Sequence, residues 1–214
     1  MKFSEFRERV RKLPYFRANM LMHMGDDKDI LEVQLCDWVK KGYVIKLRRG
    51  IYTLSNNQRS CPVSDYFLAN NLYSPSYVSL EAALSHYHFI PERVYEVTSI
   101  TPMKTMKFNN NLGRFTYRNI KASAFSHYEE QEDVDGYKFL IATKEKALLD
   151  FLYFATRHLK IVKENIFDLS FRFQNLESVS CAKLIEAAAV FEQKKMMHSA
   201  QLLAEYIMEE WQND

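Results

Sequence analysis

The sequence predicts an α+β protein, with an N-terminal winged helix-turn-helix followed by a mixed α/β domain that has a small, largely antiparallel sheet and a helical C-terminal tail. Residues 1–55 contain three short helical patterns and then an alternating, basic hairpin pattern, which is the element order of a winged helix-turn-helix. From residue 64 onward, helical and strand patterns mix, and after about residue 161 only helical patterns remain. We therefore expect two domains, residues 1–55 and 64–214.

The composition is that of a globular protein. Of the 214 residues, 47% are hydrophobic and 14% aromatic, which is enough for packed cores and too much for a disordered chain. The three cysteines, Cys36, Cys61 and Cys181, lie far apart and form no CxxC pair, so neither a disulfide framework nor a thiolate zinc site is expected. No stretch has the apolar length of a signal peptide core or a membrane span, so we expect a cytoplasmic protein.

The charge is divided unevenly along the chain. Residues 1–55 carry 12 Lys and Arg against 7 Asp and Glu, whereas the remainder carries 17 against 20. A basic module on a mildly acidic body favours nucleic-acid binding by the first domain, because neutralising phosphates supplies most non-specific affinity.

Three helices are expected in the first domain. Ser4 to Leu13 forms the first, with Ser4 as N-cap, and Phe16 to Met22 the second. Lys28 to Lys41 forms the third and ends at Gly42. Its expected N-caps are Asp26, Asp27 and Asp29, and its expected buried stripe is Ile30, Val33, Leu35 and Trp38.

The segment YVIKLRRGIYTL predicts a β-hairpin that reverses at Arg49-Gly50. One face of the hairpin carries Tyr43, Ile45, Leu47, Ile51 and Thr53. The Ser-, Asn- and Pro-containing stretch after it predicts a linker.

The second domain is expected to mix both kinds of element. Helices are predicted at 65–72, 81–88, 144–156, 180–191 and 194–211. Strands are predicted at 76–80, 94–101, 103–108, 113–120 and 137–143, and residues 129–136 are predicted to be an exposed acidic loop.

Basic and amide side chains of the first domain are the candidate DNA contacts. On the hairpin these are Lys46, Arg48 and Arg49; before and on the third helix they are Arg17, Lys28, Gln34, Lys40 and Lys41. The alternative is a solvated, charged turn. The acids Asp27, Asp29, Glu32 and Asp37 oppose phosphate binding by the third helix, so the hairpin and the first-helix cations Arg7, Arg9, Arg11 and Lys12 are expected to contribute much of the affinity.

No motif indicates catalysis or a cofactor. His86 and His88 stand two residues apart on a predicted helix and point to different faces, so no metal site is expected. GxSxG, HExxH and phosphate-binding glycine loops are absent from the sequence, which predicts that the protein is not an enzyme. Thr143 is expected to cap the helix that follows it, and Asp150 to face out of the apolar stripe of that helix or to form a buried ion pair.

Three segments in order, LCDWVKKGYVIKLRRGIYTL, SYVSLEAALSHYHFIPERVYEVTSIT and FLIATKEKALLDFLY, resemble the AbiEi-type antitoxins of bacterial type IV toxin–antitoxin systems, over roughly residues 16–155. The resemblance implies that the N-terminal domain binds inverted repeats in its own promoter, through Lys46, Arg48 and Arg49. It also implies that the second domain counteracts a nucleotidyltransferase-like toxin. The residues that match the recurrent core of the family are Tyr77, Ser79, Leu84, Glu145, Lys146 and Asp150.

Two alternatives remain open at this stage. In one, the first domain docks a protein partner without binding DNA. In the other, the chain is an enzyme that acts on nucleotides or RNA, which would need a cleft with converging carboxylates and a divalent ion.

Overall fold

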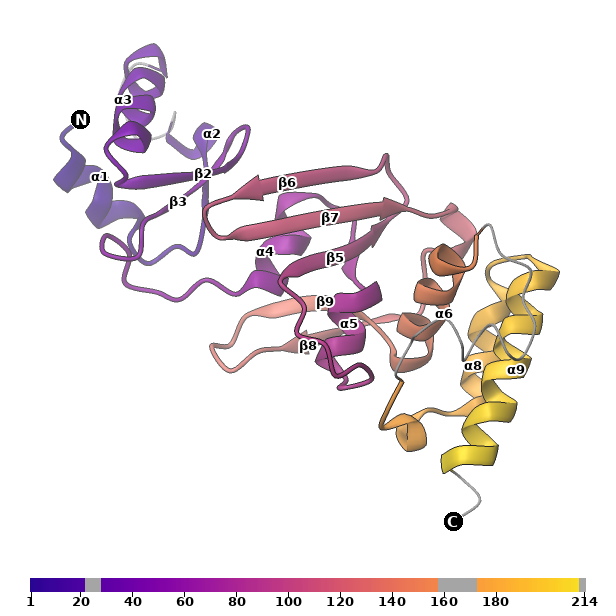
Figure 1. Ribbon diagram of the computed structural model, residues 1–214. Coiled ribbons are helices and arrows are strands. Elements are labelled where there is room, and N and C mark those ends of the chain that lie inside the picture. Colours follow the sequence, from indigo (N-terminus) through magenta and orange to yellow (C-terminus); the bar gives the residue numbers. More distant parts are fainter. Residues whose placement is uncertain (22–27, 158–172, 212–214) are drawn as a thin grey trace.

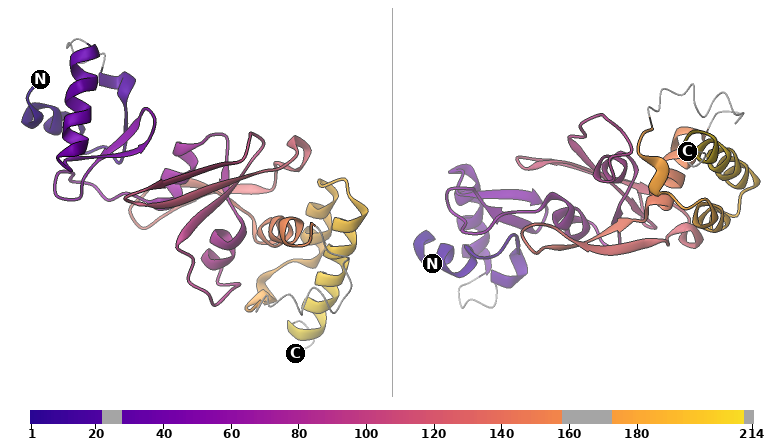
Figure 2. Two further views of the ribbon diagram at one scale, coloured as in Figure 1. Left: turned by 45° about the horizontal axis from the view of Figure 1, so that its top comes forward. Right: turned by 90° about the horizontal axis from the view of Figure 1, so that it is seen from below.

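The structure is a computed structural model that describes residues 1–21, 28–157 and 173–211, and it confirms the α+β class. A three-stranded sheet with helices lies at the N-terminal end, a six-stranded sheet in the middle, and helices at the C-terminal end (Figure 1). The two termini lie at opposite ends of an elongated molecule, as the further views in Figure 2 also show.

The N-terminal part alternates helices with short strands. In chain order it contains α1 (Phe3–Val10), β1 (Phe16–Arg17), α2 (Ala18–Leu21), α3 (Lys28–Lys40), β2 (Val44–Arg48) and β3 (Ile51–Leu54). The strands form an antiparallel sheet in the order β1-β3-β2. A small core of its own holds this part together, made of Phe6, Val10, Phe16, Leu31, Leu35, Trp38, Val44 and Leu54.

Two expectations for the first turns of the chain are wrong. Phe16 and Arg17 do not begin a helix, because they pair with β3 opposite Tyr52 and Ile51, and the helix starts only at Ala18. Ser4 is not an N-cap: α1 begins at Phe3, and Lys2 occupies the cap position without a side-chain hydrogen bond.

The helix α3 has the expected extent but only part of the expected buried stripe. Leu35 and Trp38 are buried together with Leu31, at the four- and three-residue spacing of one helix face. Ile30 and Val33 fall on the other face and are 54% and 71% exposed. The expected caps Asp26 and Asp27, and the side chain of Asp29, lie outside the described part of the chain.

The β2-β3 hairpin is confirmed, and its two faces pack on different cores. Val44 and Leu54 belong to the small core. Leu47 and Ile51 belong to the large core of the second part, and Ile45 packs against it. The hairpin therefore joins the two parts of the molecule. The ten residues after it, 55–64, contain one turn at 56–58 and no helix or strand, and Ser60 N donates to Arg11 O at 2.8 Å.

The six-stranded sheet runs β6-β7-β5-β4-β9-β8. Its strands are β4 (Tyr77–Val78), β5 (Glu96–Thr101), β6 (Met106–Asn110), β7 (Gly113–Asn119), β8 (Tyr128–Glu132) and β9 (Lys138–Ala142). The pairs β5-β7 and β4-β9 are parallel and the other three antiparallel, so the sheet is mixed and larger than expected. It is mixed because two hairpins form its ends. The second strand of each, β7 or β9, lies beside a strand that runs in the same direction.

The predicted acidic loop is wrong in part, because Tyr128–Glu132 is the edge strand β8. Acidic side chains suit an edge strand, since charge discourages pairing with another chain. Glu130 also forms an ion pair with Lys138 of the neighbouring β9, at 2.8 Å.

Helices cover both faces of the sheet. On one face lies α4 (Asp65–Leu72), where Tyr117 of β7 donates a hydrogen bond to Ala69 O at 2.6 Å. On the other lies α5 (Leu80–His86), where Ala82 N donates to Thr98 Oγ1 at 3.0 Å. The two helices are drawn behind and in front of the sheet in Figure 1.

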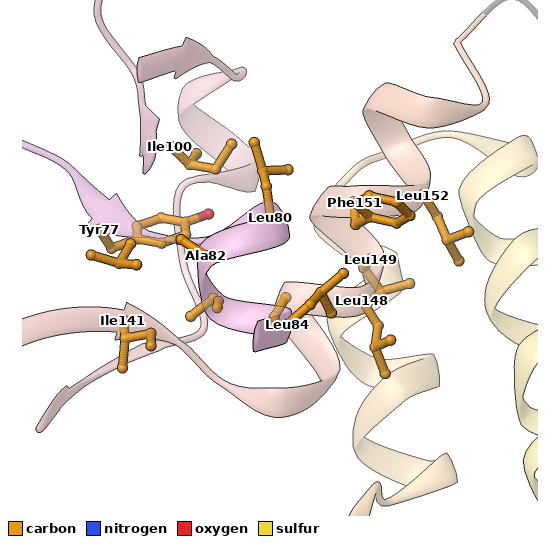
Figure 3. Packing of buried hydrophobic residues seen from close by; sticks show 14 of the residues in the cluster. Tyr77, Leu80, Ala82, Leu84, Ile100, Ile141, Leu148, Leu149, Phe151 and Leu152 are labelled. Atoms are coloured by element: carbon orange, nitrogen blue, oxygen red, sulfur yellow. The ribbon is translucent and has the colours of Figure 1, made fainter. Parts of the chain in front are cut away.

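The remaining helices stack outward from α5. Apolar side chains of α5 meet those of α6 (Lys144–Ala155), with sheet residues such as Tyr77 and Ile141 beside them (Figure 3). Beyond α6 lie a 3-10 turn (Leu176–Ser178), α8 (Cys181–Ala189) and α9 (Lys194–Trp211), which confirms a helical tail over residues 176–211. Its expected start near residue 161 lies outside the described residues. None of the helices described has both the length and the apolar character to cross a membrane.

Replacing Thr143 by Ala should lower the free energy of unfolding by about 1 kcal/mol, because α6 loses the side-chain oxygen that accepts from Lys146 N at 3.3 Å. The matched control is Ser4→Ala inside α1, which should change this free energy by less than about 0.5 kcal/mol. Urea denaturation measures both. Equal destabilisation by the two substitutions would contradict the assignment of the caps.

Candidate nucleic-acid interface

The turn of the β2-β3 hairpin is held in place by the neighbouring strand. Gly50 adopts a φ of +79°, a conformation that favours glycine, and its carbonyl accepts from Ala18 N at 3.0 Å. Arg17 lies opposite Ile51 in β1, so it stands next to the turn that carries Arg49. Residues 32 positions apart in the sequence thus bring their cations to one end of the sheet.

Five of the expected contact residues are open to solvent: Lys41, which pairs with Asp37, and four others. Arg17, Lys40, Lys46 and Arg49 have exposed side chains. Within the residues described, none of these four forms an ion pair with a carboxylate. Their charges are available to an anion such as a phosphate group.

Arg48 has a different environment from Arg49. The pairing of β2 with β3 is irregular between Lys46 and Arg48, which places Arg48 opposite Ile51 on the face that packs on the second part. Its guanidinium carbon lies 5.8 Å from the centre of the Phe108 ring in β6. Its Nε is buried and has no hydrogen-bond partner among the described residues. Arg48 therefore belongs to the contact between hairpin and large sheet.

The other expected contacts on or beside α3 either have a partner in the described structure or lie outside it. Lys41 is paired with Asp37 at 2.7 Å, and this hydrogen bond raises the pKa of the Lys41 ammonium. The Gln34 side-chain oxygen accepts from the N-terminal amine of Met1 at 3.4 Å. Lys28 begins the helix, but its side chain lies outside the described part of the structure.

Nearby carboxylates partly neutralise the cations of α1. Arg9 pairs with Glu5 at 3.1 Å, and Arg11 pairs with Glu8 at 2.8 Å. Arg7 lies 3.7 Å from Glu8 and also donates from Nε to Gln58 O at 3.0 Å. These arginines support the local structure, which reduces what they can offer to DNA.

The outer face of α3 is apolar and acidic. It exposes Ile30 and Val33, and Glu32 lies beside them in the sequence. Burial raises the pKa of the Tyr52 hydroxyl on β3, and Cys36 and Glu32 of α3 raise it further. This face is poorly suited to reading base edges, which calls for Arg, Lys, Asn or Gln.

Four polar side chains of the second part form a buried network. The Lys146 ammonium forms an ion pair with Asp150 Oδ1 and donates to Tyr77 OH at 2.9 Å. Asp150 Oδ2 accepts from Tyr77 OH at 3.0 Å and from Ser79 Oγ at 2.8 Å. Lys146 and Asp150 are both 0% exposed, so the expected buried ion pair is confirmed and the outward-facing Asp150 is wrong.

The electrostatics of this network follow from its burial. Burial and the Asp150 carboxylate hold the pKa of Tyr77 well above its usual value, so its hydroxyl remains a donor. Burial lowers the pKa of the Lys146 ammonium, although Asp150 counteracts this effect. The Lys146 ammonium also lies 4.7 Å from the centre of the Phe191 ring.

The network connects β4, α5 and α6. The sequence carries a signal for this network in two spacings. Tyr77 and Ser79 are two residues apart near a strand, and Lys146 and Asp150 are four residues apart on a helix. Each spacing keeps the two side chains on one face of its element. All four side chains are buried, and their hydrogen bonds hold the sheet, the start of α5 and α6 together.

The histidines and carboxylates do not gather into a metal centre in the residues described, where no group of three or more His, Cys, Asp or Glu could hold an ion. His86 Nε2 lies 2.9 Å from Gln131 Oε1 of β8, so it is engaged in a contact between α5 and the sheet edge.

Comparison with protein-family models gives no match to this chain, and comparison with curated proteins gives none either.

The Lys146–Asp150 pair can be tested by a double-mutant cycle. Lys146→Met and Asp150→Leu should each lower the free energy of unfolding by about 3–5 kcal/mol, because each leaves a buried charge unpaired. The double variant should lose clearly less than the sum of the two, since both charges are then removed. Denaturant titration measures the three variants. Strictly additive losses would contradict a direct interaction.

Proposed function

We propose that this chain is the antitoxin of a type IV toxin–antitoxin system and a DNA-binding regulator of its own operon, with residues 1–55 as a winged helix-turn-helix. The observation that carries the proposal is the hairpin end with its exposed cations Arg17, Lys46 and Arg49, which form no ion pair with a carboxylate of the described residues. The element order helix, strand, two helices and two strands, with the sheet order β1-β3-β2, supports it.

The resemblance to AbiEi-type antitoxins adds the second half of the proposal. The partner would be a nucleotidyltransferase-like toxin in the cytoplasm, and the second domain would counteract it by binding and not by catalysis. The segments that carry the resemblance contain the hairpin and the buried network of Tyr77, Ser79, Lys146 and Asp150. Both features hold the molecule together, as residues shared by a family often do.

Removing two hairpin charges in the variant Lys46→Ala, Arg49→Ala should weaken binding to the DNA directly upstream of the gene. If each cation neutralises one phosphate, the slope of log affinity against log salt concentration becomes about 2 less steep. Fluorescence anisotropy with that DNA at several salt concentrations measures both quantities.

The matched control is Lys138→Ala, Lys183→Ala, which removes two exposed charges from β9 and α8. It should leave the affinity and the slope unchanged. Arg48 is unsuitable as a control because its side chain packs on Phe108. An unaltered affinity after the hairpin substitutions would place the DNA-binding surface elsewhere.

A second candidate function is protein docking through α3, favoured by the exposed Ile30 and Val33. If α3 binds the toxin, Ile30→Ser, Val33→Ser should abolish growth rescue when the protein is co-expressed with the neighbouring toxin. This variant should bind the upstream DNA as the unaltered protein does. If the unaltered protein does not bind that DNA even at low salt, the variant should not bind it either. Full rescue by this variant would exclude the docking role of α3.

A further inference from the structure

A cleft of about 910 Å³ lies on the α5 face of the large sheet. Its floor is formed by β5, β6 and β7, and its walls include α5 and the C-terminal end of α6. Figure 1 shows β6 and β7 extending past α5, toward the end of α6. The volume falls in the range of sites that hold one small molecule.

Four cations line this cleft: Lys107, Arg118, Lys121 and Arg157. Lys107 pairs in register with Thr116 of β7, and Arg118 follows two residues later, so all three share the sheet face that floors the cleft. In the described chain none of the four cations forms an ion pair with a carboxylate. Arg118 is oriented by the Phe154 ring, whose centre lies 5.2 Å from the guanidinium carbon.

The cleft also has an acidic side. Glu81 of α5 and Glu96 of β5 line it. Glu96 accepts a hydrogen bond from Thr116, whereas Glu81 Oε2 is buried and has no hydrogen-bond partner among the described residues. A buried carboxylate oxygen without a hydrogen-bond donor is energetically unfavourable. If the Glu81 side chain turns toward the cleft, an N–H or O–H group of a ligand would supply the missing hydrogen bond.

An aromatic ring stands at the same site. Tyr95 lines the cleft and is 79% exposed, although aromatic side chains usually bury their rings. The guanidinium carbon of Arg93 lies 5.2 Å from the centre of its ring. An exposed, partly oriented ring of this kind is a stacking surface for a planar base.

We propose that this cleft binds a nucleotide, with its phosphates on the four cations and its base or ribose donors toward Glu81 and Tyr95. Such a ligand matches a cleft that is basic on one side and acidic with an aromatic ring on the other. An inorganic polyphosphate matches only the basic side. A long RNA backbone would bring phosphates past Glu81 and Glu96, which repel them.

The lining of the cleft includes none of the hairpin cations Arg17, Lys46 and Arg49. The nucleotide proposal therefore does not depend on DNA binding. Nucleotide binding and DNA binding are measured with different variants, so a negative result for one of the two proposals leaves the other standing.

Isothermal titration calorimetry of the full chain with ATP and with GTP tests the proposal, with inorganic triphosphate, adenosine and guanosine as comparison ligands. At least one nucleotide should bind, and about tenfold or more tightly than inorganic triphosphate. The nucleosides should bind much more weakly, because they lack the charges that the cations recognise.

Two exposed cleft cations are removed in Lys107→Gln, Lys121→Gln, which should weaken nucleotide binding about tenfold or more. The matched control Lys138→Gln, Lys183→Gln has the same change in net charge outside this cleft and should stay within about twofold. Glu81→Gln should bring the affinity for inorganic triphosphate closer to that for the nucleotide, because it removes a charge that repels phosphate. Thermal melting of each variant checks that it is folded.

The proposal is overturned if neither nucleotide binds, if inorganic triphosphate binds as tightly as the nucleotides, or if the control variant loses as much affinity as the cleft variant. It is also overturned if a 12-nucleotide single-stranded RNA binds and neither ATP nor GTP displaces it. That result would assign the cleft to RNA.

Discussion

The buried ion pair between Lys146 and Asp150 is the constraint on which the second part of the structure depends. Neither charge has access to water, so each is tolerable only with its full set of partners, and Tyr77 and Ser79 supply these from β4 and the start of α5. The pair thus requires one relative position of sheet and α6. The helix α8 is positioned in turn, because Glu145 beside the pair accepts from Ser180 N at 3.0 Å.

The β2-β3 hairpin connects the N-terminal part of the molecule to the second part. Its one face completes the small N-terminal core and its other face enters the large core, so the two parts share a structural element. Asn110 of β6 donates to Leu47 O at 3.2 Å, and Arg48 packs on Phe108 in the same contact. A ligand at the exposed cations of the hairpin would therefore act on a ribbon that the large sheet holds next to its turn.

Three surfaces of different chemistry result from this arrangement. The hairpin end offers exposed cations, α3 offers apolar side chains, and the cleft over β5, β6 and β7 offers cations opposite two carboxylates. These surfaces share no residue.

Local patterns in the sequence determined most of the elements, because periodicity, caps and turn residues act within a few positions. The β2-β3 hairpin, the Thr143 cap and α3 up to Gly42 are of this kind. Pairing between distant strands decided what such patterns leave open. Phe16 and Arg17 form a strand because β3 lies beside them, and the acidic segment 128–132 forms a strand because β9 lies beside it. It also decided the roles of the charges. Arg48 and Arg49 are neighbours with the same chemistry, yet Arg48 is packed and Arg49 is exposed. The irregular pairing of β2 and the position of Phe108 cause this difference.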